Sequence, residues 1–151
     1  MKKLLLTISL LIFFSALACT PDKQEKEIIQ NTAASSLNQK ETQYYSNGRK
    51  LYRTICANCH MENGSGLGRL IPPLVQSNYL VDNRTDLSRI IKYGLSGPIR
   101  VDGEDYNQPM PANPGLTDLE IAMILTYVGN TWGNNMGGFT LEEVQQGLSV
   151  N

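Results

Sequence analysis

Hydrophobic and polar residues recur at helical spacing in three stretches of this chain. The first stretch carries Tyr45, Gly48, Leu51, Tyr52 and Ile55 at steps of three and four residues. Side chains with that spacing lie on one face of an α-helix. The pattern therefore predicts an amphipathic helix that begins near residue 44 and runs into residue 56.

The second stretch, TDLSRIIKYG, predicts a shorter helix in the middle of the chain. Thr85 or Asn83 can cap its start, and Gly94 ends it. Its buried stripe consists of Leu87, Ile90 and Ile91.

The third stretch, LTDLEIAMILTYVGNTWGN, predicts the last strong helix. Thr117 and Glu120 form a capping box at its start, and a weaker signal of the same kind at Thr140 and Glu143 predicts a short terminal helix. Its apolar face consists of Ile121, Ile124, Leu125, Val128 and Trp132. Before this helix, the turn residues of segment 102–103 predict a small β-hairpin.

The first 18 residues have the pattern of an export signal. Lys2 and Lys3 precede an apolar run from Leu4 to Leu17, which is shorter than the ~20 residues of a membrane-spanning helix. Ala16-Leu17-Ala18-Cys19 resembles the bacterial lipobox, in which the cysteine becomes a lipid-modified N-terminus. We therefore expect residues 1–18 to be a signal peptide of lipoprotein type, with Cys19 anchored to a membrane surface. Ordinary cleavage near Ala18 is the alternative.

The rest of the chain divides into three parts. Residues 19–42 are polar with little apolar periodicity, which predicts a flexible tether. Residues 43–133 form the predicted globular domain, and residues 134–151 form a C-terminal extension with the short helix. The net charge is −1, and loss of Lys2 and Lys3 with the signal leaves 11 basic against 14 acidic side chains, or −3. Because no basic patch appears, nucleic acid is not an expected partner.

The segment CANCH at residues 56–60 carries the chemistry of this chain. Two cysteines separated by two residues can add to the two vinyl groups of a haem, and the histidine that follows then falls under the iron. We therefore predict that Cys56 and Cys59 bind one haem c covalently and that His60 is its proximal iron ligand. With Cys19 lipid-modified, none of the three cysteines remains for a disulfide.

Other uses of a cysteine pair fit this sequence less well. A thioredoxin-like pair needs a strand–turn–helix setting and has no adjacent histidine. A zinc site needs four ligands, and the folded region offers only Cys56, Cys59 and His60. A disulfide between the two cysteines is compatible with an exported protein, but it leaves His60 without a role.

The second axial ligand must be another kind of group, because His60 is the one histidine of the sequence. Methionine, lysine, water and an open position are the options. Met61 adjoins His60 and cannot reach the opposite side of the ring, whereas Met110 lies between two prolines that hold the backbone extended. We favour Met110 as the axial ligand. The alternatives within the chain are a lysine, Met123 and Met136.

These residues together resemble the class I cytochromes c, in the subgroup similar to the haem-c subunits of bacterial terminal oxidases and periplasmic dehydrogenases. The likeness covers the chain from about Tyr44 to Gly133. It rests on Gly48 and Tyr52, on CANCH, on Ile71-Pro72-Pro73-Leu74, on Met110-Pro111, and on Ile124-Leu125-Thr126-Tyr127.

The resemblance implies an all-α fold, in which three to four helices surround one covalently bound haem and a small hairpin precedes the loop of the axial methionine. It implies that the first and last helices of the domain cross at Gly48, packed by Tyr127. It also implies that the backbone carbonyl of Pro72, or of Pro73 beside it, accepts a hydrogen bond from His60. Candidate haem walls are Leu70, Ile71, Leu74, Ile90, Ile91, Tyr93, Ile99 and Leu125. Candidate propionate partners are Arg84, Arg100 and Trp132.

The expected function is electron transfer by an electron carrier rather than an enzyme. A thioether ligand and an apolar pocket both favour ferrous iron and raise the reduction potential. The expected partners are redox proteins, a respiratory or dehydrogenase donor and an oxidase or reductase, at the periplasmic face of a bacterial membrane. The alternative is a haem enzyme or gas sensor with a labile sixth ligand, for which the sequence offers no second histidine as a distal acid or base.

Overall fold

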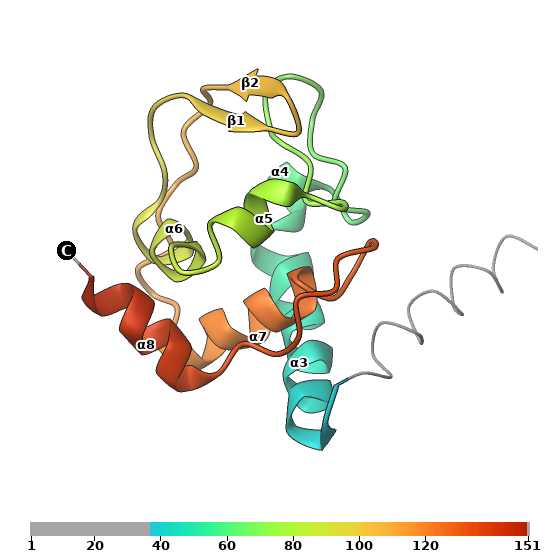
Figure 1. The fold of residues 1–151 in the computed structure, drawn as a ribbon, viewed down its shortest axis with the longest axis vertical. Helices are drawn as coiled ribbons and strands as arrows, with labels where there is room; N and C mark the ends of the chain where they lie inside the picture. The colour runs from blue at the N-terminus through green and yellow to red at the C-terminus, as the bar shows by residue number, and fades with distance from the viewer. Residues whose placement is uncertain (1–36, 151) are drawn as a thin grey trace, which may run out of the picture.

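The computed structural model describes residues 37–150 of the chain. The predicted signal peptide, the predicted lipid site at Cys19 and the predicted tether up to residue 36 lie outside the described residues. The described part is mostly helical, with six helices and a single two-stranded sheet (Figure 1). The four longer helices are those that the sequence pattern predicts. No helix within residues 37–150 is both long and apolar enough to span a membrane.

The longest helix, α3 (Gln39–Ile55), begins inside the segment that we predicted to be a tether. The Asn38 side chain accepts a hydrogen bond from the Glu41 N–H at 3.0 Å, and the Glu41 carboxylate accepts one from the Asn38 N–H at 2.8 Å. This capping box starts the helix before its apolar stripe begins. The tether boundary at residue 42 was therefore wrong, because hydrophobic periodicity detects only the part of a helix that packs.

Helix α7 (Asp118–Val128) crosses α3 through the middle of the molecule (Figure 1). The contact is made at Gly48, where a Cβ atom would overlap the backbone carbonyl of Met123 and lie 3.0 Å from the Cβ of Tyr127. A residue with any side chain at this position would push the two helices apart. The contact that the resemblance implied at Gly48 and Tyr127 is therefore confirmed.

Trp132 lies beyond the end of α7, in a loop, with a φ of 55°. Its placement on the apolar face of the helix was wrong. The helix stops at Val128 because the Asn134 side chain donates to the Val128 carbonyl at 2.9 Å and to the Leu74 carbonyl at 2.7 Å. The chain is thereby drawn across the helix end, and the Trp132 ring packs against Tyr52 at a centroid distance of 5.1 Å.

Two short helices come before α7 in the chain, of which the first packs against the predicted hairpin and the second packs against α7. The single-turn helix α5 (Asn78–Asp82) escaped prediction, because one turn carries no periodicity. The following helix, α6 (Leu87–Tyr93), ends at Gly94 as predicted, with φ 82°. Neither Thr85 nor Asn83 caps it: its N-cap is Asp86, and the Asn83 side chain donates instead to the Tyr79 carbonyl of α5 at 2.9 Å.

The predicted hairpin and terminal helix are both present. Strands β1 (Ile99–Val101) and β2 (Glu104–Tyr106) pair antiparallel around the two-residue turn Asp102-Gly103, whose φ angles are 51° and 89°. Turns with two such positive φ values match the natural twist of paired strands. Helix α8 (Leu141–Ser149) begins after Thr140, whose hydroxyl accepts from the Glu143 N–H, and it packs against α6 and α7.

Candidate haem site

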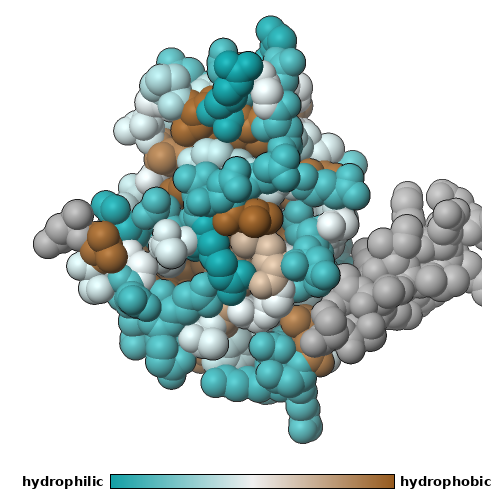
Figure 2. All heavy atoms as spheres, in the orientation of Figure 1, coloured by the Kyte–Doolittle hydropathy of each residue, from teal (hydrophilic) through white to brown (hydrophobic). Residues whose placement is uncertain are grey.

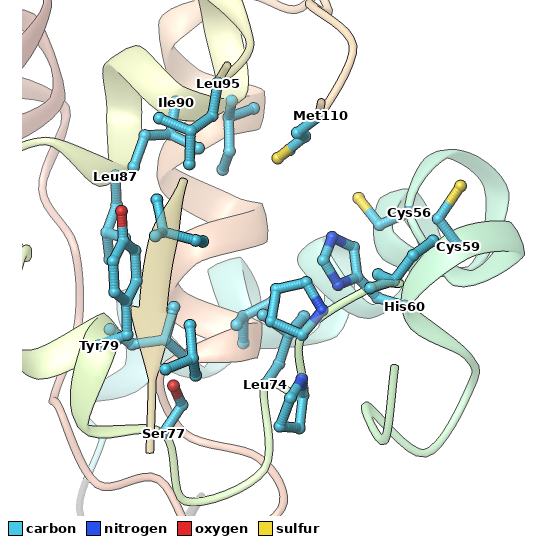
Figure 3. Close-up of a pocket in the computed structure, with 18 of the residues that line it drawn as sticks. Cys56, Cys59, His60, Leu74, Ser77, Tyr79, Leu87, Ile90, Leu95 and Met110 are labelled. Carbon is cyan, nitrogen blue, oxygen red and sulfur yellow. The ribbon is translucent and has the colours of Figure 1, made fainter. Parts of the chain in front are cut away.

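Helix α4 (Ala57–His60) follows α3 directly, with Cys56 at its N-cap and with Cys59 and His60 inside it. The Cys56 carbonyl accepts hydrogen bonds from the N–H groups of Cys59 and His60, at 3.1 and 3.0 Å. This turn brings both thiols and the imidazole to the edge of one cavity (Figure 3). Cys59 is exposed and Cys56 is half-buried, whereas Nδ1 of His60 is buried. The thiols therefore lie at the rim and the imidazole lies further in.

The cavity is large and almost entirely apolar. The space between its walls amounts to about 1010 Å³, part of which is open to solvent. Apolar surface appears below the hairpin in Figure 2, on a face that is otherwise mostly polar. Seven of the predicted wall residues line the cavity: Leu70, Ile71, Leu74, Ile90, Ile91, Ile99 and Leu125.

The eighth predicted wall residue, Tyr93, does not line this cavity, and it is 61 % exposed. It follows Ile91 by two residues on α6, so the turn of the helix carries it to the other face. Further walls come from residues that the sequence pattern did not assign to the haem. They are Leu80, Leu87, Leu95, Val101, Ile124 and Val128. Three of these belong to predicted helical stripes, and the others come from elements too short to show a period.

Burial favours the neutral form of the His60 imidazole. Burial lowers its pKa below the ordinary value, and the backbone carbonyl of Pro72 acts in the opposite direction and raises it. That carbonyl stands beside the ring, although Nδ1 makes no hydrogen bond of normal geometry. The structure thus brings Pro72 to His60, as the resemblance implied. Neutral imidazole is the form that binds metals.

The thiol of Cys56 has the opposite character to a redox-active cysteine. Burial, together with the neighbouring Cys59, raises its pKa to about 11. Cysteines that exchange disulfides have lowered pKa values, because the thiolate is the nucleophile. The Cys56 thiol is therefore poorly suited to thiol–disulfide exchange. Within residues 37–150, no group of three or more His, Cys, Asp and Glu side chains forms a metal site of the zinc type.

A tight loop after α4 brings Pro72 to the site. The N–H of Leu67 donates to the Ile71 carbonyl at 3.0 Å, and the N–H of Leu74 donates to the Gly64 carbonyl at 2.7 Å. Gly66 lies inside this loop, where a Cβ atom would overlap the Ile71 carbonyl and come within 2.6 Å of the Pro72 carbonyl oxygen. The loop can close this tightly only with glycine at that position.

Met110 reaches the cavity from the side opposite His60 (Figure 3). Its backbone is fixed by a two-way bridge to Leu95: the Met110 N–H donates to the Leu95 carbonyl at 2.9 Å, and the Leu95 N–H donates to the Met110 carbonyl at 3.0 Å. Gly94 permits this approach, because a Cβ atom there would lie 2.6 Å from the Met110 carbonyl oxygen. The Asn113 N–H then donates to the Ile91 carbonyl at 3.2 Å. The methionine segment is thus tied to the end of α6.

Met110 is the one methionine among the described residues that lines the cavity. Met61 and Met123 lie elsewhere, the first just past α4 and the second against Gly48. Met136 packs beside Gly129, where its Cβ would meet an added side chain at 3.3 Å. No lysine within residues 37–150 lines the cavity either.

Tyr52 is a wall residue whose role the sequence does not reveal. Its side chain is fully buried and lines the cavity, and its hydroxyl donates to the Met61 carbonyl at 2.6 Å. Burial raises the pKa of the phenol above its ordinary value, so the group remains a donor. Hydrophobic periodicity predicts that a tyrosine in a helical stripe is buried in the core, but it does not indicate where the tyrosine hydroxyl lies.

The three candidate propionate partners are engaged away from the cavity, and none lines it. The Arg84 guanidinium binds Glu143 on α8 and two backbone carbonyls. Arg100 faces Asp105 across the hairpin at 3.8 Å, and Trp132 packs on the aromatic cluster of α3 and α7. The sequence does not reveal which distant group a charged or amphipathic side chain contacts. For this reason the prediction for these three residues was wrong.

The residues present fit a covalently bound haem. Two thiols stand at one rim, a buried imidazole lies further in with Pro72 beside it, a thioether faces it, and apolar walls enclose the space between. In this arrangement Cys56 and Cys59 would hold the porphyrin edge, and His60 would bind the iron. The polar lining groups are few: Tyr52, Ser77, Tyr79 and Gln108 accompany His60 and the cysteines.

Comparison with known proteins gives the same result. The family described as cytochrome c matches residues 45–132. Cytochrome c-552 of Thermus thermophilus is 34% identical over 112 residues, which are 67% of this chain and 83% of the relative. The cytochrome c subunit of a quinone alcohol dehydrogenase from Gluconobacter oxydans is 31% identical over 93 residues, which are 60% of this chain and 19% of that subunit.

The family match spans the whole haem cavity, from α3 to the end of α7. It includes both thiols, the imidazole, Pro72 and Met110. The small hairpin stands before the methionine segment, as the resemblance implied. The chain belongs to the cytochrome c family, as a class I member that carries one covalently bound haem c and transfers electrons.

Proposed function

We propose that His60 and Met110 are the two axial ligands of the haem iron, and that the chain is an electron carrier outside the bacterial cytoplasm. The observation that carries this proposal is the position of Met110. Its side chain enters the cavity opposite His60, and its backbone is bound in both directions by Leu95. Haem c with an imidazole and a thioether ligand supplies one-electron exchange at a raised potential.

The chain's own residues serve this role by keeping the site apolar and stationary. The leucine, isoleucine and valine walls exclude water and favour the less charged ferrous form. Gly66 lets Pro72 approach the imidazole, and Gly94 lets Met110 approach α6. Cys59 is exposed, so the covalently held edge reaches the surface, where a protein partner can exchange an electron.

The polar side chains that line the cavity favour the proposed carrier role over a haem enzyme or a gas sensor. The polar residues of the lining are Tyr52, Ser77, Tyr79 and Gln108, besides the attachment residues. None of these is an acid or base that titrates near neutral pH, as peroxide chemistry requires. A thioether held against α6 also leaves no open coordination position for a gas.

We further propose that the chain is exported and attached to a membrane surface through lipid on Cys19. The support is the apolar N-terminal run followed by that cysteine. Two or more acyl chains on the residue would hold the protein at the surface. Its partners are then redox proteins, a respiratory or dehydrogenase donor and an oxidase or reductase. Mass spectrometry of the native N-terminus tests the anchor: an unmodified N-terminus near residue 19 would contradict it.

Two matched variants test the axial ligand. Met110→Leu and Met123→Leu conserve volume, but only the first removes the thioether from the cavity. We expect Met110→Leu to lower the reduction potential of the holoprotein and to allow carbon monoxide to bind the ferrous iron. Met123→Leu should leave both properties unchanged. An unaltered potential in Met110→Leu would mean that another group is the ligand, and ready carbon monoxide binding by the wild type would favour the sensor or enzyme.

A further inference from the structure

The residue that follows His60 has an unusual backbone conformation. Met61 has φ 63° and ψ 155°, a region that is essentially reserved for glycine and is unfavourable for any residue with a side chain. Such a conformation persists only where the surrounding structure enforces it. The position of this strain, directly beside the proximal histidine, calls for a group that holds the Met61 peptide in place.

Tyr52 is that group. Its hydroxyl donates to the Met61 carbonyl at 2.6 Å, and the Gly64 N–H donates to the same oxygen at 3.1 Å. The Tyr52 side chain is 0% exposed, and its ring packs against Tyr127 and Trp132 at centroid distances of 5.4 and 5.1 Å. The ring cannot turn away, so the hydroxyl is aimed at one fixed point.

The other contact to the Met61 carbonyl is braced by the same aromatic cluster. A Cβ atom at Gly64 would lie 2.6 Å from the Trp132 ring, so the indole lies directly on the Gly64 backbone. Tyr52 therefore supplies one of the two donors to the Met61 carbonyl oxygen, and Trp132 holds the backbone that supplies the other, the Gly64 N–H. The aromatic cluster of α3 and α7 reaches the haem site through this oxygen.

The imidazole is positioned from two sides. A metal-bound histidine usually donates its second ring N–H to a carbonyl or carboxylate, which sets the ring orientation. Here the backbone carbonyl of Pro72 stands beside the ring, although Nδ1 makes no hydrogen bond of normal geometry. The place of the ring depends also on the backbone from which it projects, and that backbone continues into the strained Met61 peptide.

We infer that Tyr52 is a positioning residue for the proximal ligand: its hydroxyl holds the Met61 peptide in the strained conformation, which fixes the backbone from which His60 projects and so contributes, together with Pro72, to the orientation of the ring. The inference rests on the proposed role of His60 as an axial ligand. In this inference the Tyr52 ring packs in the core, and the Tyr52 hydroxyl has the separate function of positioning His60.

The test uses the ferric holoprotein and the variant Tyr52→Phe, which removes only the hydroxyl. Proton NMR of the haem methyl groups reports the orientation of the axial imidazole, because their paramagnetic shifts depend on the plane of that ring. We expect Tyr52→Phe to change the shift pattern. We also expect the equilibrium constant for electron exchange with a reference couple to change about threefold or more, the order of one lost hydrogen bond.

Two substitutions at Met61 separate positioning from simple stability. Glycine adopts the conformation without strain, whereas alanine does not. We expect the wild-type shift pattern to return in Tyr52→Phe/Met61→Gly and to stay altered in Tyr52→Phe/Met61→Ala. A merely structural role predicts no such difference, because the hydroxyl is missing from both double variants.

An unchanged shift pattern and exchange constant in Tyr52→Phe would overturn the inference while leaving His60 as the ligand. If the spectrum of the wild-type holoprotein shows no imidazole bound to the iron, the proposed ligation by His60 is instead wrong. If Tyr52→Phe yields no holoprotein, the single variants Met61→Gly and Met61→Ala test whether the Met61 peptide is strained. Met61→Gly should then unfold with an equilibrium constant at least about threefold smaller than Met61→Ala, against the usual order of these residues. Equal or reversed stability would disprove the strain.

Discussion

Arg84 attaches the C-terminal extension to the haem domain, and its removal should loosen that extension. The guanidinium binds the Glu143 carboxylate with two hydrogen bonds, Nε to Oε1 at 2.7 Å and Nη2 to Oε2 at 3.1 Å. It also donates to the carbonyls of Met136 and Gly138, at 2.8 and 3.0 Å. Its flat face lies 3.8 Å from the centre of the Phe139 ring. One side chain thus holds four points of segment 136–143.

The magnitude follows from the partial burial of this cluster. The two charged side chains are 30% and 31% exposed, so solvent screens the pair only in part. Hydrogen bonds to charged groups contribute about 1.5–3 kcal/mol each, and a cation over an aromatic face adds about 0.5–2 kcal/mol. These contributions overlap, because one guanidinium makes all of them. We expect Arg84→Ala to lower the free energy of unfolding by about 3 kcal/mol, and Arg84→Lys by roughly half of that.

Urea unfolding of the holoprotein, followed by far-ultraviolet circular dichroism, measures the effect. With a slope of about 1–3 kcal/mol per molar urea, the midpoint should fall by 1 M or more. Arg100→Ala is the control, since its ion pair spans 3.8 Å between side chains that are 71% and 80% exposed. Such a pair contributes about 0–1 kcal/mol. An Arg84→Ala midpoint no lower than that of Arg100→Ala would refute the reasoning.

Three further predictions concern the helix crossing, the methionine segment and acid stability. Gly48→Ala should destabilise the holoprotein by about 3 kcal/mol or more, because the added Cβ overlaps the Met123 backbone; thermal unfolding measures it, and a loss under about 1 kcal/mol would contradict the crossing. Gly94→Ala should displace Met110, the proposed sixth ligand, and speed its replacement by added imidazole about tenfold, the effect of roughly 1.4 kcal/mol of strain. Hydrogen bonds from the helix N-cap lower the pKa of Glu120 below 4.5, so its carboxylate stabilises the fold above that pH and this stabilisation disappears as the pH falls through the lowered pKa. The melting temperature of wild type should therefore exceed that of Glu120→Gln at neutral pH and converge with it in acid, and a constant difference would count against the assignment.

The sequence alone determined the attachment chemistry and the main helices. Two cysteines and a histidine within five residues leave few uses, because covalent chemistry depends on local spacing. The stripes of α3, α6 and α7 follow from helical periodicity, and the capping box at Thr117 and Glu120 marks the start of α7 at the predicted residue. The two-residue turn Asp102-Gly103 likewise defines its hairpin through local backbone preference.

The tertiary structure decided which distant residues meet. Five methionines stand in the sequence, and only the bridge between Leu95 and Met110 shows which of them the fold ties into the cavity. The partners of Arg84 and the site of Trp132 were beyond prediction, because they depend on a loop that turns back across the end of α7. The hydrogen bond from Tyr52 to the Met61 carbonyl was equally hidden. Periodicity records that a side chain is buried, but the direction of its polar atom is set by packing between helices.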